Sequence, residues 1–419
     1  MCSSAGSTTQ AQVAWRKPTA APASAVRSSF NLRRSPAASQ CPTNATRGVP
    51  MSRIPKPASL VSVPIPLARH RPTRRALTMA LAAFALLALL LVPRQAQAGK
   101  KLQIVATIPT YGSIAEFIAG DRGDVHSLAK GYEDPHFVRP KPSLAVTLGK
   151  ADVLLSTGLD LELWLPALMD KASNPKIRSG QPGFVSVSDG LKLLDKPTVI
   201  SRGEGGMHIY GNPHIYTGPL NGKIMARNIM IGLKKVDPAG ADTYERNYKR
   251  FVARVDRSMY GSKLVKILGS KVLTKLTLSG KLIPFLEGRD YKGKKLSSYL
   301  GGWMSKALPL RGRKIVAYHK NWAYFARTFG VNIIDYVEPK PGIPPSPGHV
   351  ASVVQKMKSQ NVKVLLAANY YSRGKVKSIA DKVGATPVIV GLAVGGEAGM
   401  GDYFSQYDVW ISRLVAATK

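Results

Sequence analysis

The strongest constraint on the fold is an alternation of short apolar segments with helical segments. Between residues 100 and 160, apolar strands are expected at 102–107, 124–128 and 152–156, and helices at 113–119 and 144–150. Short apolar strands that alternate with helices are typical of parallel sheets covered by helices. This part of the sequence therefore predicts an α/β lobe.

The same alternation returns in the last third of the chain. The expected strands are 313–318, 331–337, 362–366 and 387–394, and the expected helices are 321–329, 347–359, 373–383 and 402–418. A second parallel sheet with helices on its faces follows from this pattern. The strand at 313–318 runs directly into His319, which places that side chain at the carboxyl end of the sheet, where α/β folds bind their ligands.

A long helical stretch separates the two blocks. Residues 221–235 form one helix, and Asp237 with Pro238 suits the N-cap and first turn of the next. Apolar side chains spaced by three or four residues give this second helix one buried face; they are Tyr244, Tyr248, Phe251, Val255 and Met259. We therefore predict an α/β fold of two lobes, each a parallel sheet flanked by helices, joined by a long spine helix, with a cleft between the lobes.

The first 98 residues have a different composition. They hold 13 of the 60 basic residues and no acidic residue, so +23 of the formal charge of +36 belongs to the remainder. Residues 76–92 are almost wholly apolar, follow Arg74 and Arg75, and precede a small-residue site at 96–98, a pattern typical of a secretory signal peptide. A retained membrane anchor is the alternative, because this apolar run is close to the shortest length that spans a bilayer.

These features divide the chain into five parts. They are a disordered leader or misassigned start (1–75), a signal peptide (76–98), an N-terminal α/β lobe (99–220), a linking helix and connector (221–310) and a C-terminal α/β lobe (311–419). The leader is rich in Ser and Arg and poor in acids, so an organellar transit peptide is an alternative for it. Both cysteines, Cys2 and Cys41, lie in the leader, so any metal site in the exported protein must use His and carboxylates.

Three histidines occupy similar places in short loops. His136 and His214 each follow a proline, whose ring fixes the backbone φ angle, and His319 follows a strand. Neutral imidazole is a common metal ligand, and three imidazoles with one open position suit zinc. Their intervals are long and match no compact zinc motif, so the spacing alone leaves packed or solvated histidines as the alternative.

Five blocks of sequence resemble the metal-binding proteins of bacterial ABC importers, the zinc- and manganese-uptake family. The blocks are 133–136 with Pro142 and Ser143, 157–164, 211–216 with Pro219, 318–326, and the proline-rich 338–347. They occur in order and extend over nearly all of residues 101–419. The resemblance implies a receptor that binds a divalent metal ion and passes it to a membrane permease.

The resemblance also implies a ligand set. The first three metal ligands of the family fall on His136, His214 and His319, and a histidine in the third place suits zinc rather than manganese. The fourth ligand is left open between water, Glu397 and Asp402. His208 is expected to be a solvated surface residue, with an accessory ligand as the alternative.

We expect Glu133, Asp134 and Asn212 to hold the tautomers of the ligand histidines. The predicted protein is a monomeric periplasmic receptor that performs no chemistry and delivers Zn²⁺, less readily Mn²⁺, to an ABC-type permease. Because a spine helix limits the motion of the lobes, release is expected through small tilts or loop rearrangement rather than wide hinge closure. The alternative is a zinc hydrolase on the same three histidines, with Glu397 as its base. Some members of the family combine uptake with adhesion, for which this sequence gives no argument.

The exported part remains strongly basic, with runs at 292–295 and 311–314. No nucleic-acid motif accompanies these runs, and an exported protein does not meet the genome, so we predict no nucleic-acid partner. We interpret the charge as a solvated exterior, with weak contact to an anionic membrane surface as the alternative.

Overall fold

The computed structural model describes residues 78–79, 100–197, 208–338, 340 and 342–419. The predicted leader and nearly all of the predicted signal peptide lie outside these residues. The chain divides into two units at Val92, and everything below concerns the second unit, which ends at Lys419. None of the described helices is both long enough and apolar enough to span a bilayer.

The first sheet has four parallel strands in the order β2-β1-β3-β4. They are β1 (Leu102–Ala106), β2 (Gly123–Ser127), β3 (Val153–Ser156) and β4 (Phe184–Ser186). The helices of this lobe are α2 (Pro109–Ala119), α3 (Pro142–Gly149) and α4 (Leu165–Ala172). The strands and helices expected here are confirmed, whereas β4 and α4 were not expected.

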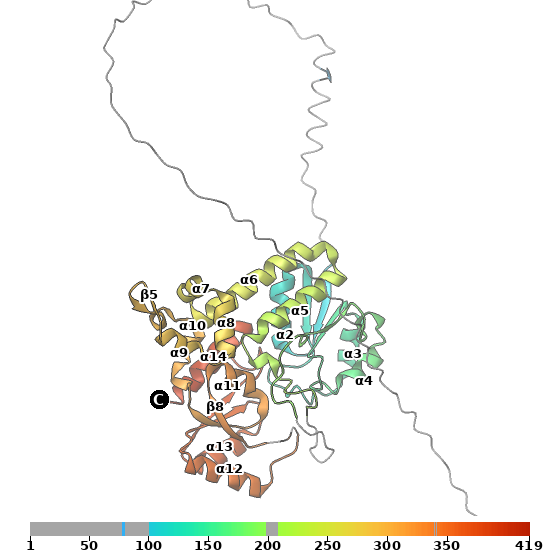
Figure 1. Cartoon of the computed structure of the whole chain (residues 1–419). Helices are drawn as coiled ribbons and strands as arrows, with labels where there is room; N and C mark the ends of the chain where they lie inside the picture. Colours follow the sequence, from blue (N-terminus) through green and yellow to red (C-terminus); the bar gives the residue numbers. More distant parts are fainter. Residues whose placement is uncertain (1–77, 80–99, 198–207, 339, 341) are drawn as a thin grey trace, which may run out of the picture. The chain divides into compact units, whose positions relative to one another are not determined.

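The second sheet has four parallel strands in the order β10-β9-β7-β8. They are β7 (Lys314–Ala317), β8 (Asn332–Tyr336), β9 (Val364–Ala368) and β10 (Thr386–Val390). The helices are α11 (Ala323–Phe329), α12 (Pro347–Ser359), α13 (Arg373–Asp381) and α14 (Tyr403–Ala416). Every element expected in this block is present, and the two lobes are seen in Figure 1.

Helices and a small hairpin connect the lobes. They are α5 (Asn221–Val236), α6 (Ala241–Tyr260), α7 (Ser262–Leu268), α8 (Ser270–Leu278), α9 (Leu282–Glu287), β5 (Asp290–Tyr291), β6 (Lys294–Lys295) and α10 (Gly302–Lys306). The apolar face expected on the spine helix α6 is confirmed: its members are buried, apart from Tyr248, which is partly buried.

The predicted N-cap at Asp237 is wrong. Pro238–Gly240 form a 3₁₀ turn without a side-chain cap, and α6 begins only at Ala241. The Asp237 carboxylate instead accepts hydrogen bonds from Arg122 Nε at 2.8 Å and from Tyr244 Oη at 2.6 Å. Burial opposes the charge of Asp237, but these bonds outweigh it and lower the pKa of the carboxyl group. A partner distant in sequence has therefore replaced the local cap.

Each sheet is covered on both faces, and the inner faces share one core. In the first sheet, Val105 and Leu154 point toward α3 and α4, while alternate residues of β1 and β3 pack against α2 and α5. The second sheet has α12 and α13 outside and α11 and α14 inside. The inner helices of both lobes belong to the same hydrophobic cluster. Wide separation of the lobes would expose this cluster to water, at a cost that grows with the apolar area.

Hydrogen bonds cross the same contact. Tyr407 Oη donates to the Tyr216 carbonyl at 2.8 Å, and Tyr403 Oη donates to the Pro219 carbonyl at 2.7 Å. The hydroxyl of Thr110 donates to the Gln406 side chain at 2.8 Å. Because buried polar groups are costly to leave unpaired, these bonds also oppose wide opening.

Candidate metal centre

Two of the predicted histidines sit in turns of identical design. The backbone N–H and the ring Nδ1–H of His136 both donate to Asp134 Oδ1, at 3.0 and 2.6 Å. The same two donors of His214 meet Asn212 Oδ1 at 3.0 and 2.9 Å. In each turn a proline stands between the acceptor and the histidine and fixes φ. The motif Asx-Pro-His thus sets both the backbone and the ring, and the predicted roles of Asp134 and Asn212 as partners of the rings are confirmed.

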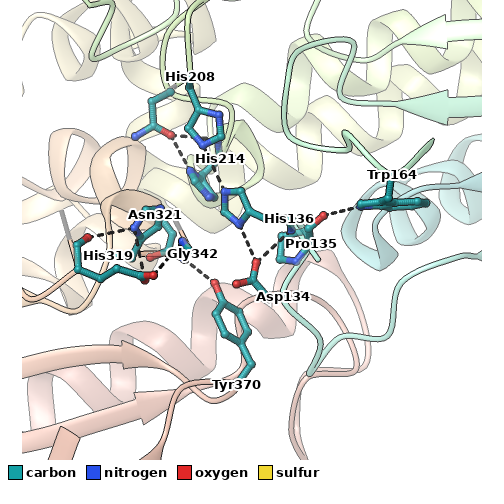
Figure 2. Close-up of polar contacts among 12 residues, drawn as sticks. Asp134, Pro135, His136, Trp164, His208, His214, His319, Asn321, Gly342 and Tyr370 are labelled. Carbon is teal, nitrogen blue, oxygen red and sulfur yellow. Dashed lines mark hydrogen bonds and ion pairs between the residues drawn. The ribbon is translucent and has the colours of Figure 1, made fainter. Parts of the chain in front are cut away.

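His319 comes from the other lobe. It follows β7 directly, and its ring Nδ1 lies 3.2 Å from the Glu338 carbonyl oxygen and 3.8 Å from that residue's carboxylate. His319 is 1% exposed and His214 is 0% exposed, so both rings are buried rather than at the rim. Figure 2 shows these rings converging from separate chain segments.

The prediction that His208 is a solvated surface residue is wrong. Its Nε2 lies 3.2 Å from His136 Nε2, and its side chain is only 14% exposed. The ring Nδ1–H donates to Asp160 Oδ1 at 3.0 Å, while the other oxygen of Asp160 accepts the Ile209 N–H at 2.8 Å. Asp160 is 48 residues away in sequence, so no local pattern could have shown that it orients His208.

One potential ligand atom from each of the four histidines lies within 4.8 Å of the others. Because every Nδ1 faces an oxygen acceptor, it must carry the ring proton in the neutral state, and every Nε2 presents a lone pair. Nε2 of His214 and of His319 is buried and has no hydrogen-bond partner among the described residues. Between His136 and His208, two such lone pairs face each other. A shared cation would satisfy all four nitrogens at once, whereas neutral imidazoles alone cannot.

Burial keeps the two inner rings uncharged. It lowers the pKa of His214 well below its usual value, and the neighbouring imidazoles lower it further. Burial also lowers the pKa of His319 to about 3, with His136 as the next cause. Metal binding requires neutral imidazole, so neither inner ring has to lose a proton before it can act as a ligand near neutral pH.

The loop at 157–164 supports the His136 turn. Trp164 Nε1 donates to the Pro135 carbonyl at 2.8 Å, one residue before His136. The buried Glu162 accepts hydrogen bonds from Thr107 Oγ1 at 2.7 Å and from Thr157 Oγ1 at 2.6 Å. Burial raises the pKa of Glu162, and these donors oppose the rise. The loop is thereby tied to the end of β1 and holds the turn in place.

Asn212 joins the two lobes beside the histidines. While its oxygen holds His214, its Nδ2 donates to the Lys320 carbonyl at 2.8 Å and to Asp195 at 2.9 Å. Lys320 follows His319 directly, so one amide side chain links the positions of His214 and His319. Tyr324 Oη adds a bond to the Asn212 carbonyl at 2.6 Å.

Three other expectations for the site are not met. Glu133 accepts the Lys130 N–H at 2.8 Å within its own turn and does not reach a ligand ring. Asp402 caps α14 through the N–H groups of Phe404 and Ser405, with its pKa lowered by these bonds against the effect of burial. Among the described residues, the group of mutually close ligand atoms consists of imidazoles and does not include Glu397 or Asp402. The fourth member of the group is His208.

Two α/β lobes with side chains converging between them form the fold of solved periplasmic metal-binding proteins. The structure resembles a zinc-bound deletion mutant of ZnuA with a TM-score of 0.56 and 23% identity, over 76% of this chain and 99% of that one. It resembles a manganese-bound periplasmic metal-binding protein from Candidatus Liberibacter asiaticus with a TM-score of 0.53 and 19% identity, over 76% and 100%.

The family described as zinc-uptake complex component A, periplasmic, matches residues 104–259 and 299–417. This is well over half of the chain, and the chain belongs to that family. This family and the curated relatives are transport proteins rather than enzymes, so sequence similarity gives no support to the hydrolase alternative.

Curated relatives carry names for different metals. The iron ABC transporter substrate-binding lipoprotein MtsA of Streptococcus pyogenes is 30% identical over 161 residues, which are 38% of this chain and 49% of that protein. The manganese ABC transporter substrate-binding lipoprotein PsaA of Streptococcus anginosus is 29% identical over 185 residues, 43% and 57%. The chain spans about half the length of the curated relatives it matches.

Proposed function

We propose that this protein is the periplasmic receptor of an ABC-type importer, that it captures Zn²⁺ with His136, His208, His214 and His319, and that it delivers the ion to a membrane permease. The observation that carries the proposal is the common orientation of the four rings. Each Nδ1 is bonded outward to oxygen, so four Nε2 lone pairs point into one space. The ion is cargo, and the protein performs no reaction on it.

The donor set favours zinc over manganese. Zn²⁺ takes four ligands in tetrahedral geometry with Zn–N distances of about 2.0–2.1 Å, which sets the ligand nitrogens roughly 3.4 Å apart. The 3.2 Å between Nε2 of His136 and of His208 is close to this spacing. Manganese prefers carboxylate and water oxygens, which the inner group does not supply. Iron and manganese, after which the relatives are named, are the competing cargoes.

The surroundings also suit a dication. Asp134 and Asp160 accept the Nδ1–H of His136 and His208, and a carboxylate behind a ligand imidazole makes that ring a stronger donor to the metal. Four neutral imidazoles leave the charge of the ion uncompensated, and these two carboxylates supply the opposite charge close to it. The donor set and its negative surroundings therefore support the same cargo.

Exposure indicates how the ion enters and leaves. The side chains of His208 and His136 are 14% and 7% exposed, whereas His214 and His319 are sealed. The ion therefore reaches the site past His208, which is the last ligand to bind and the first to detach. Because the lobes share a core, we propose that release proceeds through detachment of His208 and small tilts rather than wide opening.

Metal content tests the proposal. Residues 99–419, purified without chelator or histidine tag, should carry about one zinc per chain by mass spectrometry. His136→Ala and His319→Ala should lose most of it. His126→Ala is the matched control, because His126 is exposed on β2 and pairs only with Asp124 among the described residues. Zinc that persists in both site variants, or a parent that holds manganese more tightly than zinc, would contradict the proposal.

A further inference from the structure

Residues 260–298 lie between the two stretches that match the family. We call them the basic segment; they comprise α7, α8, α9 and the β5–β6 hairpin, which neighbour one another in the connecting part of the molecule (Figure 1). Leu264, Leu273 and Leu286 are fully buried and anchor the segment to the core of the protein. It is therefore a fixed part of the molecule that lies outside the family match.

The basic segment carries an excess of unpaired positive charge. It contains eight lysines and one arginine against Glu287 and Asp290, a net charge of +7 in 39 residues. All nine cationic side chains are exposed. Within the part of the chain that the structure describes, Lys295 is the one cation of the segment that forms an ion pair, with Asp290 at 3.0 Å. The other eight form no ion pair with a described residue.

Apolar side chains are exposed among these lysines. Val272, Leu278 and Tyr291 are 45%, 41% and 38% exposed. In α8, Lys271, Lys275 and the exposed Leu278 are spaced by four and three residues, so they share one side of the helix. Lysines interspersed with exposed aliphatic and aromatic side chains are typical of surfaces that rest on lipid headgroups.

The hairpin places a lysine where its backbone is strained. Lys292 and Gly293 form the two-residue loop between β5 and β6, with φ angles of 50° and 75°. Asn or Gly is favoured where φ is positive, and lysine adopts this conformation at a cost. The ammonium group of Lys292 lies 5.7 Å from the centre of the Tyr291 ring. The tip of the hairpin thus presents a cation and an aromatic ring together.

We propose that the basic segment docks on the surface of an anionic lipid bilayer. Its charge complements phosphate headgroups, and its exposed apolar side chains would enter the headgroup region. Lysine outnumbers arginine eight to one, whereas recognition of nucleic acid favours the bidentate guanidinium group. The surface would keep the receptor near the membrane in which its permease resides. It does not involve the histidines, so its failure would leave the metal site untouched.

Vesicle sedimentation tests this docking. Residues 99–419 contain both sheets and every described hydrophobic core, so this part is expected to fold alone. It should bind vesicles of 30% phosphatidylglycerol in phosphatidylcholine and not vesicles of phosphatidylcholine alone. Changing Lys263, Lys271, Lys275 and Lys294 to Gln should weaken binding by roughly 600-fold, because each of the four lysines near an anionic surface is worth roughly fivefold. High salt should have the same effect on the parent.

The control changes four exposed lysines outside the segment, Lys150, Lys171, Lys363 and Lys382, to Gln. It should bind almost as the parent does, with unchanged thermal melting in all three proteins. Equal weakening in both variants would mean diffuse charge and would overturn the proposal, as would a parent that ignores anionic vesicles. Tighter binding to duplex DNA than to vesicles at the same salt would also overturn it. Zinc content measured on the same samples reports separately on the metal site.

Discussion

The two lobes contribute unequally to the candidate metal centre. The lobe of the first sheet supplies His136, His208 and His214, and each ring is held by a side-chain oxygen at 2.6 to 3.0 Å. Among the described residues, the lobe of the second sheet supplies His319 alone, which is held by a backbone carbonyl at 3.2 Å. The difference suggests that the first lobe carries a preformed three-imidazole site and that the second lobe completes it.

The unequal contribution of the two lobes can be tested by removing histidines from one lobe or the other. Structural zinc sites bind with about 10–16 kcal/mol, so one ligand of four is worth about 3 kcal/mol, or about a hundredfold in affinity. His319→Ala should therefore retain weak zinc binding through the three remaining histidines. The double change His136→Ala with His214→Ala should abolish measurable binding in a competition with a chromophoric chelator. Equal loss in the two proteins would refute the preformed site.

Asn212 is where the two lobes meet, and changing it should uncouple them. Asn212→Asp keeps the acceptor for His214 but cannot donate to the Lys320 carbonyl, and it sets a second carboxylate beside Asp195. We expect zinc affinity to fall by about 10- to 100-fold, as for other groups that orient metal ligands. Asn332→Ala, on an exposed position of β8, is the control and should leave affinity unchanged. Wild-type affinity in Asn212→Asp would show that Asn212 supports zinc binding only through its bond to His214 and not through its bond to the Lys320 carbonyl.

The buried ligand of the second lobe should make the metal-free protein sensitive to acid. The folded-state pKa of His319 is about 3, far below the usual value of 6.5, so the unfolded chain takes up a proton that the folded protein refuses. Stability is then fully present above pH 6.5 and declines as the pH falls toward 3, by about 1.4 kcal/mol per pH unit for this residue. Denaturant unfolding at several pH values in the presence of chelator gives the free energy of unfolding. Between pH 6.5 and pH 3 this free energy should decline less steeply in His319→Gln than in the parent. An identical dependence on pH in the two proteins would exclude His319 as the source of the acid sensitivity.

The smallest effect is expected at the outermost ligand. Asp160→Asn keeps an oxygen for His208 Nδ1 but removes the negative charge and the second oxygen, which accepts the Ile209 N–H. Zinc affinity should fall by roughly a few-fold, below the usual range for such changes. Combined with His208→Ala, the Asn substitution should add nothing, because its only effect on the metal passes through that ring. Additive losses in calorimetric titrations would show that Asp160 acts on the metal by another route.

Features that depend on residues close together in the sequence could be predicted, and features that depend on contacts between distant residues could not. Parallel strands and helices were predictable because their apolar periodicity is a local property of the sequence. His136 and His214 were singled out by the proline before each and by the resemblance of their sequence blocks to the metal-uptake family. The cap expected at Asp237 failed because Arg122, distant in the chain, takes its carboxylate. His208 was missed as a member of the cluster for the same reason, since Asp160 orients it from 48 residues away. Contacts of this kind leave no signal in spacing.

The elements of the basic segment were also not predicted. Its helices are short, α7 has seven residues and α9 has six, and the hairpin strands have two residues each. Periodicity needs several turns to be recognised, so such elements depend on their tertiary anchors, here Leu264, Leu273 and Leu286. The sequence revealed the charge of this region without its shape.

The most direct test of the central claim is a crystal structure of residues 99–419 loaded with one equivalent of zinc. The account predicts a tetrahedral ion held by Nε2 of His136, His208, His214 and His319 at about 2.0–2.1 Å, with each Nδ1 still bonded to its oxygen. Zinc held by three of these histidines with Glu397 or water in the fourth place would contradict the role given to His208. Zinc bound elsewhere, with the four rings empty, would contradict the proposed site as a whole.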